Sequence, residues 1–226
     1  MYVISFANPK GGTGKTTAAL LLAEQLAKAG AKVVMLDCDP NQNIVMWGTD
    51  RQDAGKTTPF QIVPRPPEEQ VVETIDNLDG SVDYVIVDLE GTAAQIVTFV
   101  LSRTDLVVIP FEPTPMETRQ AARAVALVKS TSRMMRRQIP FTLLLTRTNA
   151  AFATSDERDV RASTSELPVL PVTLVRRAAF TRIFRESLLL SELKANQVSN
   201  LEAAVNNARD YAQAIANALK IQEAAE

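Results

Sequence analysis

The feature that most constrains this chain is a cluster of glycines close to its N-terminus. Three of its eight glycines fall within four positions, and a lysine and two threonines follow them: Gly11, Gly12, Gly14, Lys15, Thr16 and Thr17. The run follows an apolar stretch with strand character and opens a stretch of helical period. Glycines allow backbone N–H groups to surround phosphate oxygens, and the helix N-terminus adds positive potential. The sequence therefore predicts a strand, a phosphate-binding loop and a helix.

The side chains of this loop have separate expected roles. Lys15 is expected to neutralise the β- and γ-phosphates of a nucleotide, and the Thr16 hydroxyl to join a Mg²⁺ shell. ATP or ADP and Mg²⁺ are therefore the expected cofactors. The whole loop is expected to contact the nucleotide, through Lys10, Gly11, Gly12, Thr13, Gly14, Lys15, Thr16 and Thr17.

The rest of the chain alternates between two hydrophobic patterns. Apolar runs suited to buried strands occupy residues 2–7, 32–36, 83–87, 106–110, 141–146 and 169–175. Helical periods occupy residues 17–29, 92–102, 117–130 and 201–220, and only residues 55–69, with four prolines, look irregular. This alternation predicts an α/β fold, a single domain over residues 1–226 with a mostly parallel twisted sheet and helices on both faces.

Two of the expected strands end in aspartate. Asp88 closes the run Val-Ile-Val-Asp, and residues 33–40 end in Asp37-Cys38-Asp39-Pro40. A magnesium nucleotide site needs carboxylates at strand ends, so Asp88 is expected to hold Mg²⁺ through water. Taken alone, either aspartate could instead be a helix cap or a turn former. Glu90 follows Asp88 in a loop and is given no catalytic role.

Composition excludes several classes of site. The chain has no histidine and one cysteine, Cys38, which we expect to be a small packed residue. His-based triads, His metal sites and an internal disulfide are thus excluded. No window approaches the roughly 20 apolar residues of a membrane span.

The charge is distributed unevenly. Residues 118–185 hold 13 Lys and Arg against 4 Asp and Glu, a net charge of +9, while the remainder holds 11 against 22, a net charge of −11. Such a basic segment favours an anionic partner. The alternative is that these charges are scattered over solvated helix faces.

One departure from the common phosphate loop points to a family. Pro9 stands where the first glycine of that loop would be, and Lys10 follows. The run from Lys10 to Thr16 resembles the deviant Walker A box of the ParA and MinD partition ATPases. Residues 6–17, 36–42, 85–91 and 106–115 all resemble the short ParA type, which lacks an N-terminal helix-turn-helix domain. A lysine in a loop could instead be solvated, so a role for Lys10 is inferred only from this resemblance.

The resemblance implies roles for further residues. Lys10 would cross a dimer interface to the partner's nucleotide, and Asp39 would order the attacking water beside Mg²⁺, so that Lys10, Lys15 and Asp39 form the catalytic set and Thr16, Asp39 and Asp88 the metal set. Residues 168–187 resemble the region where several ParA proteins contact DNA, and also an accessory ATPase of bacterial T-DNA transfer. That region gives candidate DNA contacts at Arg176, Arg177, Arg182 and Arg185. Residues near the adenine base would be Thr146, Arg147 and Pro171.

The function that this resemblance implies is an ATP-dependent homodimer that binds double-stranded DNA without sequence preference. A ParB-like or small centromere-binding protein would activate hydrolysis and release the dimer, in the cytoplasm and on the nucleoid. No membrane partner is expected, because residues 220–226 carry a surplus of acid that anionic lipid repels. One alternative keeps this switch but moves a protein cargo: a chemoreceptor cluster, a carboxysome or a DNA-transfer complex. The other is a metabolic ATP-dependent enzyme.

Overall fold

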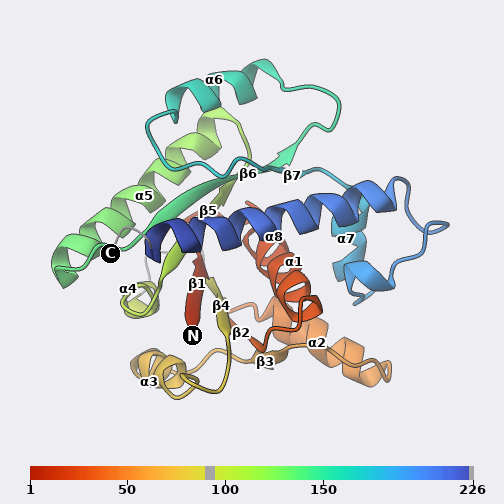
Figure 1. The fold of residues 1–226 in the computed structure, drawn as a ribbon, viewed down its shortest axis with the longest axis horizontal. Coiled ribbons are helices and arrows are strands. Elements are labelled where there is room, and N and C mark those ends of the chain that lie inside the picture. The colour runs from red at the N-terminus through yellow and green to blue at the C-terminus, as the bar shows by residue number, and fades with distance from the viewer. Residues whose placement is uncertain (90–94, 224–226) are drawn as a thin grey trace.

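A computed structural model describes residues 1–89 and 95–223 of the chain. Its strands form one parallel sheet in the order β3-β2-β4-β1-β5-β6-β7 (Figure 1). The strands are β1 (Tyr2–Phe6), β2 (Val33–Cys38), β3 (Gln61–Val63), β4 (Tyr84–Leu89), β5 (Leu106–Phe111), β6 (Phe141–Thr148) and β7 (Leu174–Val175). The central position of β1 places the glycine-rich loop at the middle of the sheet's carboxyl edge.

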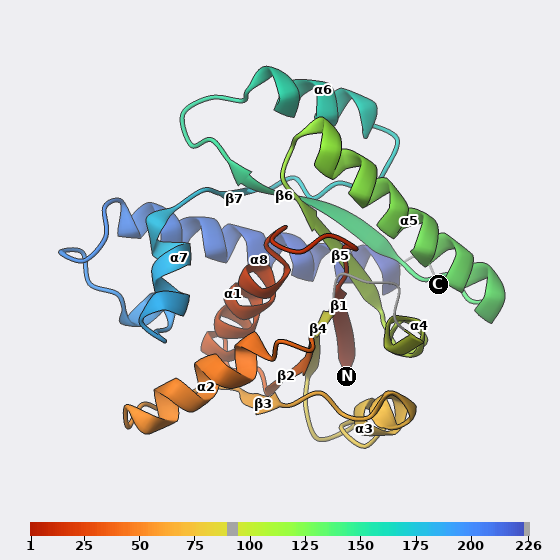
Figure 2. The ribbon, with the colours of Figure 1, turned by 180° about the vertical axis from the view of Figure 1, so that it is seen from behind.

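Helices cover both faces of the sheet (Figures 1 and 2). One core joins the sheet to α1 (Lys15–Lys28), α2 (Asn43–Asp53), α7 (Ala178–Arg185) and α8 (Leu201–Glu223). The other joins it to α3 (Val71–Asp76), α4 (Gln95–Leu101), α5 (Pro115–Met135) and α6 (Ser155–Ser163), and two 3₁₀ turns occupy Glu68–Gln70 and Leu190–Glu192. The predicted α/β fold is therefore confirmed.

Strand β1 shows why the apolar runs lack alternation. Ile4 and Phe6 pack into one core and Val3 into the other, so successive side chains are buried on opposite faces. Helices on both faces of the sheet shield the side chains of such a strand from water on either side. The continuous hydrophobic runs of the sequence are the direct result.

Two sequence predictions of local structure were wrong in part. The stretch 55–69 is not wholly irregular, because β3 lies within it and pairs with β2 before Pro64 ends the strand. The strand predicted over 169–175 is confined to Leu174 and Val175, with a single bridge from Val169 to Leu143. Pro171 lies between them and lacks the N–H that a continuous ladder needs.

Helix α2 is anchored to a distant part of the chain. Its Trp47 stacks on Phe60 and donates its indole N–H to the carbonyl of Ile183 in α7, at 2.9 Å. Arg51 lies under the Trp47 ring and forms a two-pronged ion pair with Glu192. A buried guanidinium is stable only when its donors are satisfied in this way. The segment that follows Asp39 is thus fixed to α7.

Within residues 1–89 and 95–223, no helix combines the length and the apolar character needed to cross a bilayer.

Candidate nucleotide-binding site

The glycine-rich loop owes its shape to two positive φ angles. Gly12 has φ 77° and Gly14 has φ 96°, a region that L side chains rarely adopt. A Cβ on Gly14 would also lie 3.4 Å from the methyl carbon of Thr146. Thr146 in turn donates its hydroxyl to the carbonyl of Thr13 at 2.8 Å, which ties β6 to the loop. The loop is therefore preformed and supported from a strand that lies far along the chain.

Lys15 closes the loop from inside. Its Nζ donates to the carbonyls of Asn8 (3.2 Å) and Lys10 (3.1 Å), so the ammonium lies within the ring of backbone that would surround a phosphate. Asn8 is held by its own bond from Nδ2 to the carbonyl of Pro110. The position of Lys15 suits the predicted contact with β- and γ-phosphates.

A cavity of about 420 Å³ opens over this loop. Lys15, Asp39 and Arg147 line it together with residues of the loop and of the turn before α2: Pro9, Gly11, Gly12, Gly14, Thr16, Thr17, Asn41 and Asn43. Sequence reasoning missed Asn41 and Asn43, although their place directly after Asp39-Pro40 could have suggested them. Lys10 is not among the lining residues.

Asp88 lies at the end of β4, directly beside Asp37 of β2. It is buried, and neither carboxylate oxygen has a hydrogen-bond partner among the described residues. Burial raises the pKa of Asp88 to about 7, while the neighbouring Thr16 hydroxyl and Lys15 lower it and Asp37 and Asp39 raise it. Two orphaned oxygens beside a hydroxyl fit a cation, as the predicted Mg²⁺ role requires.

The carboxylates near the loop do not form a metal cage by themselves among the described residues. Within the described ranges, no group of three or more Asp, Glu, Cys or His could bind a metal. Mg²⁺ commonly uses one or two carboxylates and completes its shell with water and substrate phosphates. The donor set therefore fits a magnesium ion that arrives with a nucleotide.

Asp37, near the end of β2, and Asp39, directly after it, have different surroundings. Asp37 is buried and accepts hydrogen bonds from the N–H groups of Ile44 and Val45, so it caps α2; burial raises its pKa. Asp39 is partly exposed and accepts two bonds from Asn41, at 2.8 and 2.9 Å. Of the two, only Asp39 lines the cavity, and its role in hydrolysis stays a prediction.

Lys10 points to a different group. Its ammonium forms an ion pair with Glu117, in the first turn of α5. The Glu117 side chain is only 11% exposed, that of Lys10 is 40% exposed, and the second Glu117 oxygen has no partner among the described residues. The pair thus stands beside the nucleotide cavity, and sequence reasoning gave no signal for it.

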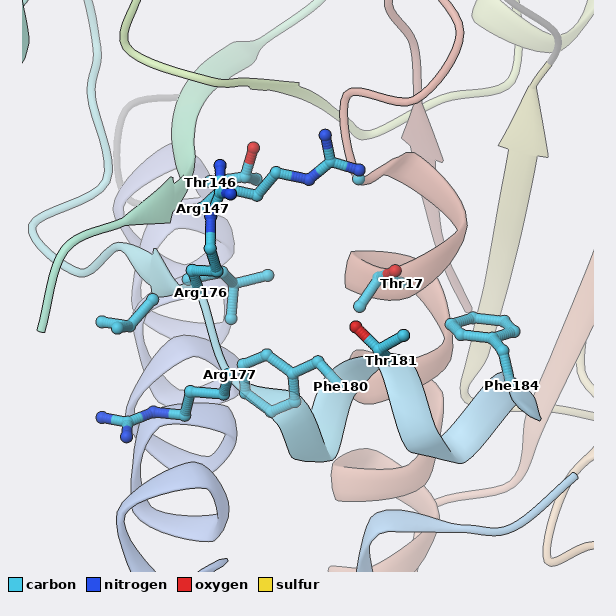
Figure 3. Close-up of a pocket in the computed structure, with 11 residues that line it drawn as sticks. Thr17, Thr146, Arg147, Arg176, Arg177, Phe180, Thr181 and Phe184 are labelled. Atoms are coloured by element: carbon cyan, nitrogen blue, oxygen red, sulfur yellow. The ribbon is translucent and has the colours of Figure 1, made fainter. Parts of the chain in front are cut away.

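A second cavity, of about 430 Å³, adjoins the loop beyond Gly14. Figure 3 shows Phe180 and Thr181 of α7 facing Thr17 of α1 across this space, with Arg147 extending over it. The other lining residues are Gly14, Thr146, Leu174, Val175, Arg176, Arg177 and Phe184. An apolar cavity with a few polar groups beside a phosphate loop suits the base and ribose of a nucleotide.

Comparison with known proteins decides the family. A family model described as VirC1 protein matches residues 1–226. The chain belongs to the VirC1 family.

Individual relatives extend this result. Protein ParA of Rhizobium radiobacter is 33% identical over 217 residues, which cover 95% of this chain and 96% of that protein. Protein virC1 of the same organism is 26% identical over 192 residues, covering 84% of this chain and 83% of that protein. The ATP complex of a McdA variant from Cyanothece has a TM-score of 0.76 at 17% identity and covers 96% of each chain, which shows the fold alone. The predicted membership of the ParA/MinD class of ATPases is confirmed.

In this member of the VirC1 family, two of the residues predicted near adenine line the second cavity. Thr146 and Arg147 do so, and Arg147 pairs with Glu112 at 3.6 Å. Pro171 does not, because it lies exposed in the connection before β7, outside the residues that line either cavity. Its neighbour Val169 forms the bridge to β6 and fixes that course of the chain.

The four arginines predicted to contact DNA differ in their partners and exposure. Arg176 pairs with Glu112 at 2.6 Å at the rim of the second cavity, and Arg177 precedes α7 with its guanidinium directed away from that cavity (Figure 3). Arg182 pairs with Glu186, and Arg185 is exposed. Their DNA contacts stay a prediction. Glu90 lies outside the described residues.

Proposed function

We propose that the chain is an ATP-gated switch: it closes as a homodimer on ATP, grips DNA without sequence preference, and opens after hydrolysis. The observation that carries the proposal is the position of Lys10. This lysine stands beside the nucleotide cavity but does not line it. A cation so placed can serve a triphosphate that a second subunit brings to the same face, where it would offset the repulsion between two facing nucleotides.

Within one subunit, the loop and Lys15 would bind the phosphates, and Thr16 and Asp88 would hold Mg²⁺. The ion would supply positive charge to the β- and γ-phosphate oxygens. Asp39 reaches the cavity from the turn before α2, where it would orient the attacking water. That role matters only in the transition state, so loss of Asp39 should slow hydrolysis more than it weakens ATP binding.

The proposed cargo and activating partner rest on the resemblance to ParA proteins. DNA is the anchor that we propose, with nucleoid association as the consequence, and a ParB-like or small centromere-binding protein as the activator. A curated relative named maintenance of carboxysome distribution protein A, from Halothiobacillus neapolitanus, is 24% identical over 198 residues. Because of this relative, the positioning of a protein cargo is the second candidate function.

Two substitutions at the site test the switch because they should have opposite effects. Lys10→Ala should still bind ATP but stay monomeric, since the charge that favours closure is gone. Asp39→Ala should bind ATP, close and remain closed, with slow phosphate release and prolonged DNA retention. Light scattering with ATP and Mg²⁺ reports the first step, and phosphate release reports the second.

Matched controls are available on exposed surface. Lys32→Ala removes a lysine before the amino end of β2, at the opposite edge of the sheet, and Asp53→Ala removes an aspartate at the end of α2. Both should behave as wild type. A Lys10 variant that dimerises normally would contradict the proposed role of that lysine, and an Asp39 variant with the wild-type rate would contradict that of Asp39.

A further inference from the structure

A long acid-free segment begins where α5 leaves the nucleotide site. Residues 118–155 contain seven Lys and Arg and no Asp or Glu. Nearly half of this segment, residues 118–135, belongs to α5, which lies between α4 and α6 on one face of the sheet (Figures 1 and 2). Four of the seven cations lie within α5, and two more follow its C-terminus directly.

The cations of α5 lie on its outward side. Its buried side, which includes Ala121, Ala124 and Val128, packs in the core shared with β5 and β6. Five exposed cations occupy the opposite side and the helix end, and we call them the α5 cationic face: Arg119, Arg123, Lys129, Arg133 and Arg136. At 1.5 Å per residue, Arg119 and Arg133 are roughly 21 Å apart along the helix axis.

These five charges have no neutralising carboxylate among the residues that the structure describes. No described carboxylate forms an ion pair with any of them, and Arg123 bonds only to the neutral Gln120. Other cations of the basic region are engaged: Arg161 with Glu157, Arg176 with Glu112 and Arg182 with Glu186. Five like charges on one helix repel one another, and an anionic partner would remove that cost.

The surface between the cations indicates which partner fits. The exposed positions between them are small: Ala122, Ala126 and Ser130. Large exposed apolar side chains occur only towards the two ends, at Met116 and Met134, so the face lacks the continuous apolar stripe of a membrane-surface helix. An acidic protein partner would usually insert an apolar side chain into a pocket beside such cations. None of the five cations lines either of the two cavities described above.

We infer that the α5 cationic face is a docking surface for the phosphate backbone of duplex DNA. A duplex carries one negative charge per roughly 1.7 Å of axis with both strands counted, so a length of about 21 Å holds about a dozen phosphates, of which those on the side of α5 can face its cations. Small residues between long cationic side chains let the backbone approach without a steric block. The inference rests on the proposed function for the identity of the partner, but it assigns the contact to α5 in place of the four late arginines.

The test compares three sets of substitutions by the salt dependence of binding to a short duplex of mixed sequence, with ATP and Mg²⁺. The triple variant Arg123→Gln, Lys129→Gln, Arg133→Gln keeps good helix formers on the exposed side of α5. The matched control is Lys32→Gln, Lys194→Gln, Lys220→Gln, all exposed and outside the acid-free segment. A third variant, Arg182→Gln with Arg185→Gln, tests the late region.

The expected result is specific to α5. Loss of three phosphate contacts should reduce the slope of log K against log salt by about 2.7 per protomer, while the matched control keeps the wild-type slope. ATP affinity and ATP-dependent dimerisation should be unchanged in the triple variant, which shows that it folds and closes.

Three outcomes would overturn the inference. If the triple variant binds like wild type and the late-region variant loses slope, DNA binds at the late arginines and the proposed function stands. If the ATP-bound wild type binds no duplex even at low salt, the inference and the DNA part of the proposed function both fail. If anionic vesicles bind in place of duplex and the triple variant loses them, the face serves a membrane.

Discussion

The two ends of the proposed nucleotide site, which we call the phosphate end and the base end, are built in different ways. The phosphate end combines short contiguous motifs at the carboxyl ends of β1, β2 and β4, and its key side chains, Lys15 and Asp88, are buried. The base end brings together β6, β7 and α7 with α1, and at its rim stands the exposed ion pair between Arg176 and Glu112. Charges act strongly where water is excluded and weakly where it is present. Function should therefore depend steeply on the first end and gently on the second.

The largest effect should follow Lys15→Ala. Removing the ammonium should weaken ATP binding by about 100-fold or more, because charge-assisted hydrogen bonds contribute about 1.5–3 kcal/mol each. Calorimetry measures the affinity, and circular dichroism confirms that the loop helix still folds. Lys28→Ala, at the far end of α1, is the control. If the Lys15 variant binds ATP as tightly as wild type, Lys15 does not hold the phosphates and the contrast between the two ends fails.

Asp88→Asn should change both stability and metal dependence. Burial raises the pKa of Asp88 to about 7, against about 3.9 in an unfolded chain. Between these values the folded chain holds a proton that the unfolded chain has released, so the free energy of unfolding falls as pH rises through this window. Lys15, Asp37 and Asp39 are the charged groups that act on this carboxyl.

The asparagine variant cannot ionise, so without nucleotide its melting temperature should depend less on pH and exceed that of wild type above pH 7. Thermal melts across the window measure this dependence. With nucleotide, Mg²⁺ should no longer strengthen binding as it does in wild type. If the melting temperature of the variant depends on pH as strongly as that of wild type, ionisation of Asp88 is not what lowers stability as pH rises.

Glu117→Gln should have a moderate effect, on assembly. The substitution keeps the shape of the side chain but releases Lys10 from its ion pair. If this pair competes with closure, the variant should dimerise with ATP at protein concentrations up to about thirtyfold lower, because each of the two subunits releases a pair worth about 1 kcal/mol. Light scattering against concentration measures the shift, with Glu202→Gln, at an exposed position of α8, as control. Weaker dimerisation would mean that Glu117 orients Lys10 for closure.

The smallest effect should follow Arg176→Gln at the base end. Its side chain is 68% exposed and its pair with Glu112 is open to solvent. Exposed pairs contribute about 0.2–1 kcal/mol, so ATP affinity should change by about fivefold at most. The same calorimetric titration used for Lys15 gives the value. A loss as large as that of Lys15→Ala would break the contrast between the two ends.

The phosphate end could be predicted because each of its parts is local in sequence. The loop of residues 10–17 and the apolar runs that lead to Asp39 and Asp88 carry their own signals. Cys38 is buried, as expected for a small packed residue, and burial raises the pKa of its thiol to about 12. The sheet followed from the repeated apolar runs, because strands covered on both faces must be apolar throughout.

Of the proposed base end, the sequence indicated only Thr146 and Arg147, through the resemblance to ParA proteins; the other parts meet only in the folded chain. Phe180 and Thr181 come from α7, whose place beside β6 and α1 no local pattern reveals, and Pro171 was misplaced because its segment was predicted as one strand. The partner of Lys10 is 107 residues away, so no local pattern could reveal Glu117. Patterns in a single sequence indicate which residues are close along the chain. Contacts between distant segments, such as Lys10 with Glu117, depend on the order of the strands in the sheet.

Trp47 provides an intrinsic fluorescence signal for conformational change. It is the single tryptophan of the chain, and it lies between Phe60 and the Arg51 guanidinium with its indole N–H bonded to α7. Helix α2 begins a few residues after Asp39, whereas α7 lines the cavity proposed for the base. Any closure that moves one helix against the other would alter the polarity around this ring and hence its fluorescence. Stopped-flow emission of the unlabelled protein would then time the conformational step separately from phosphate release.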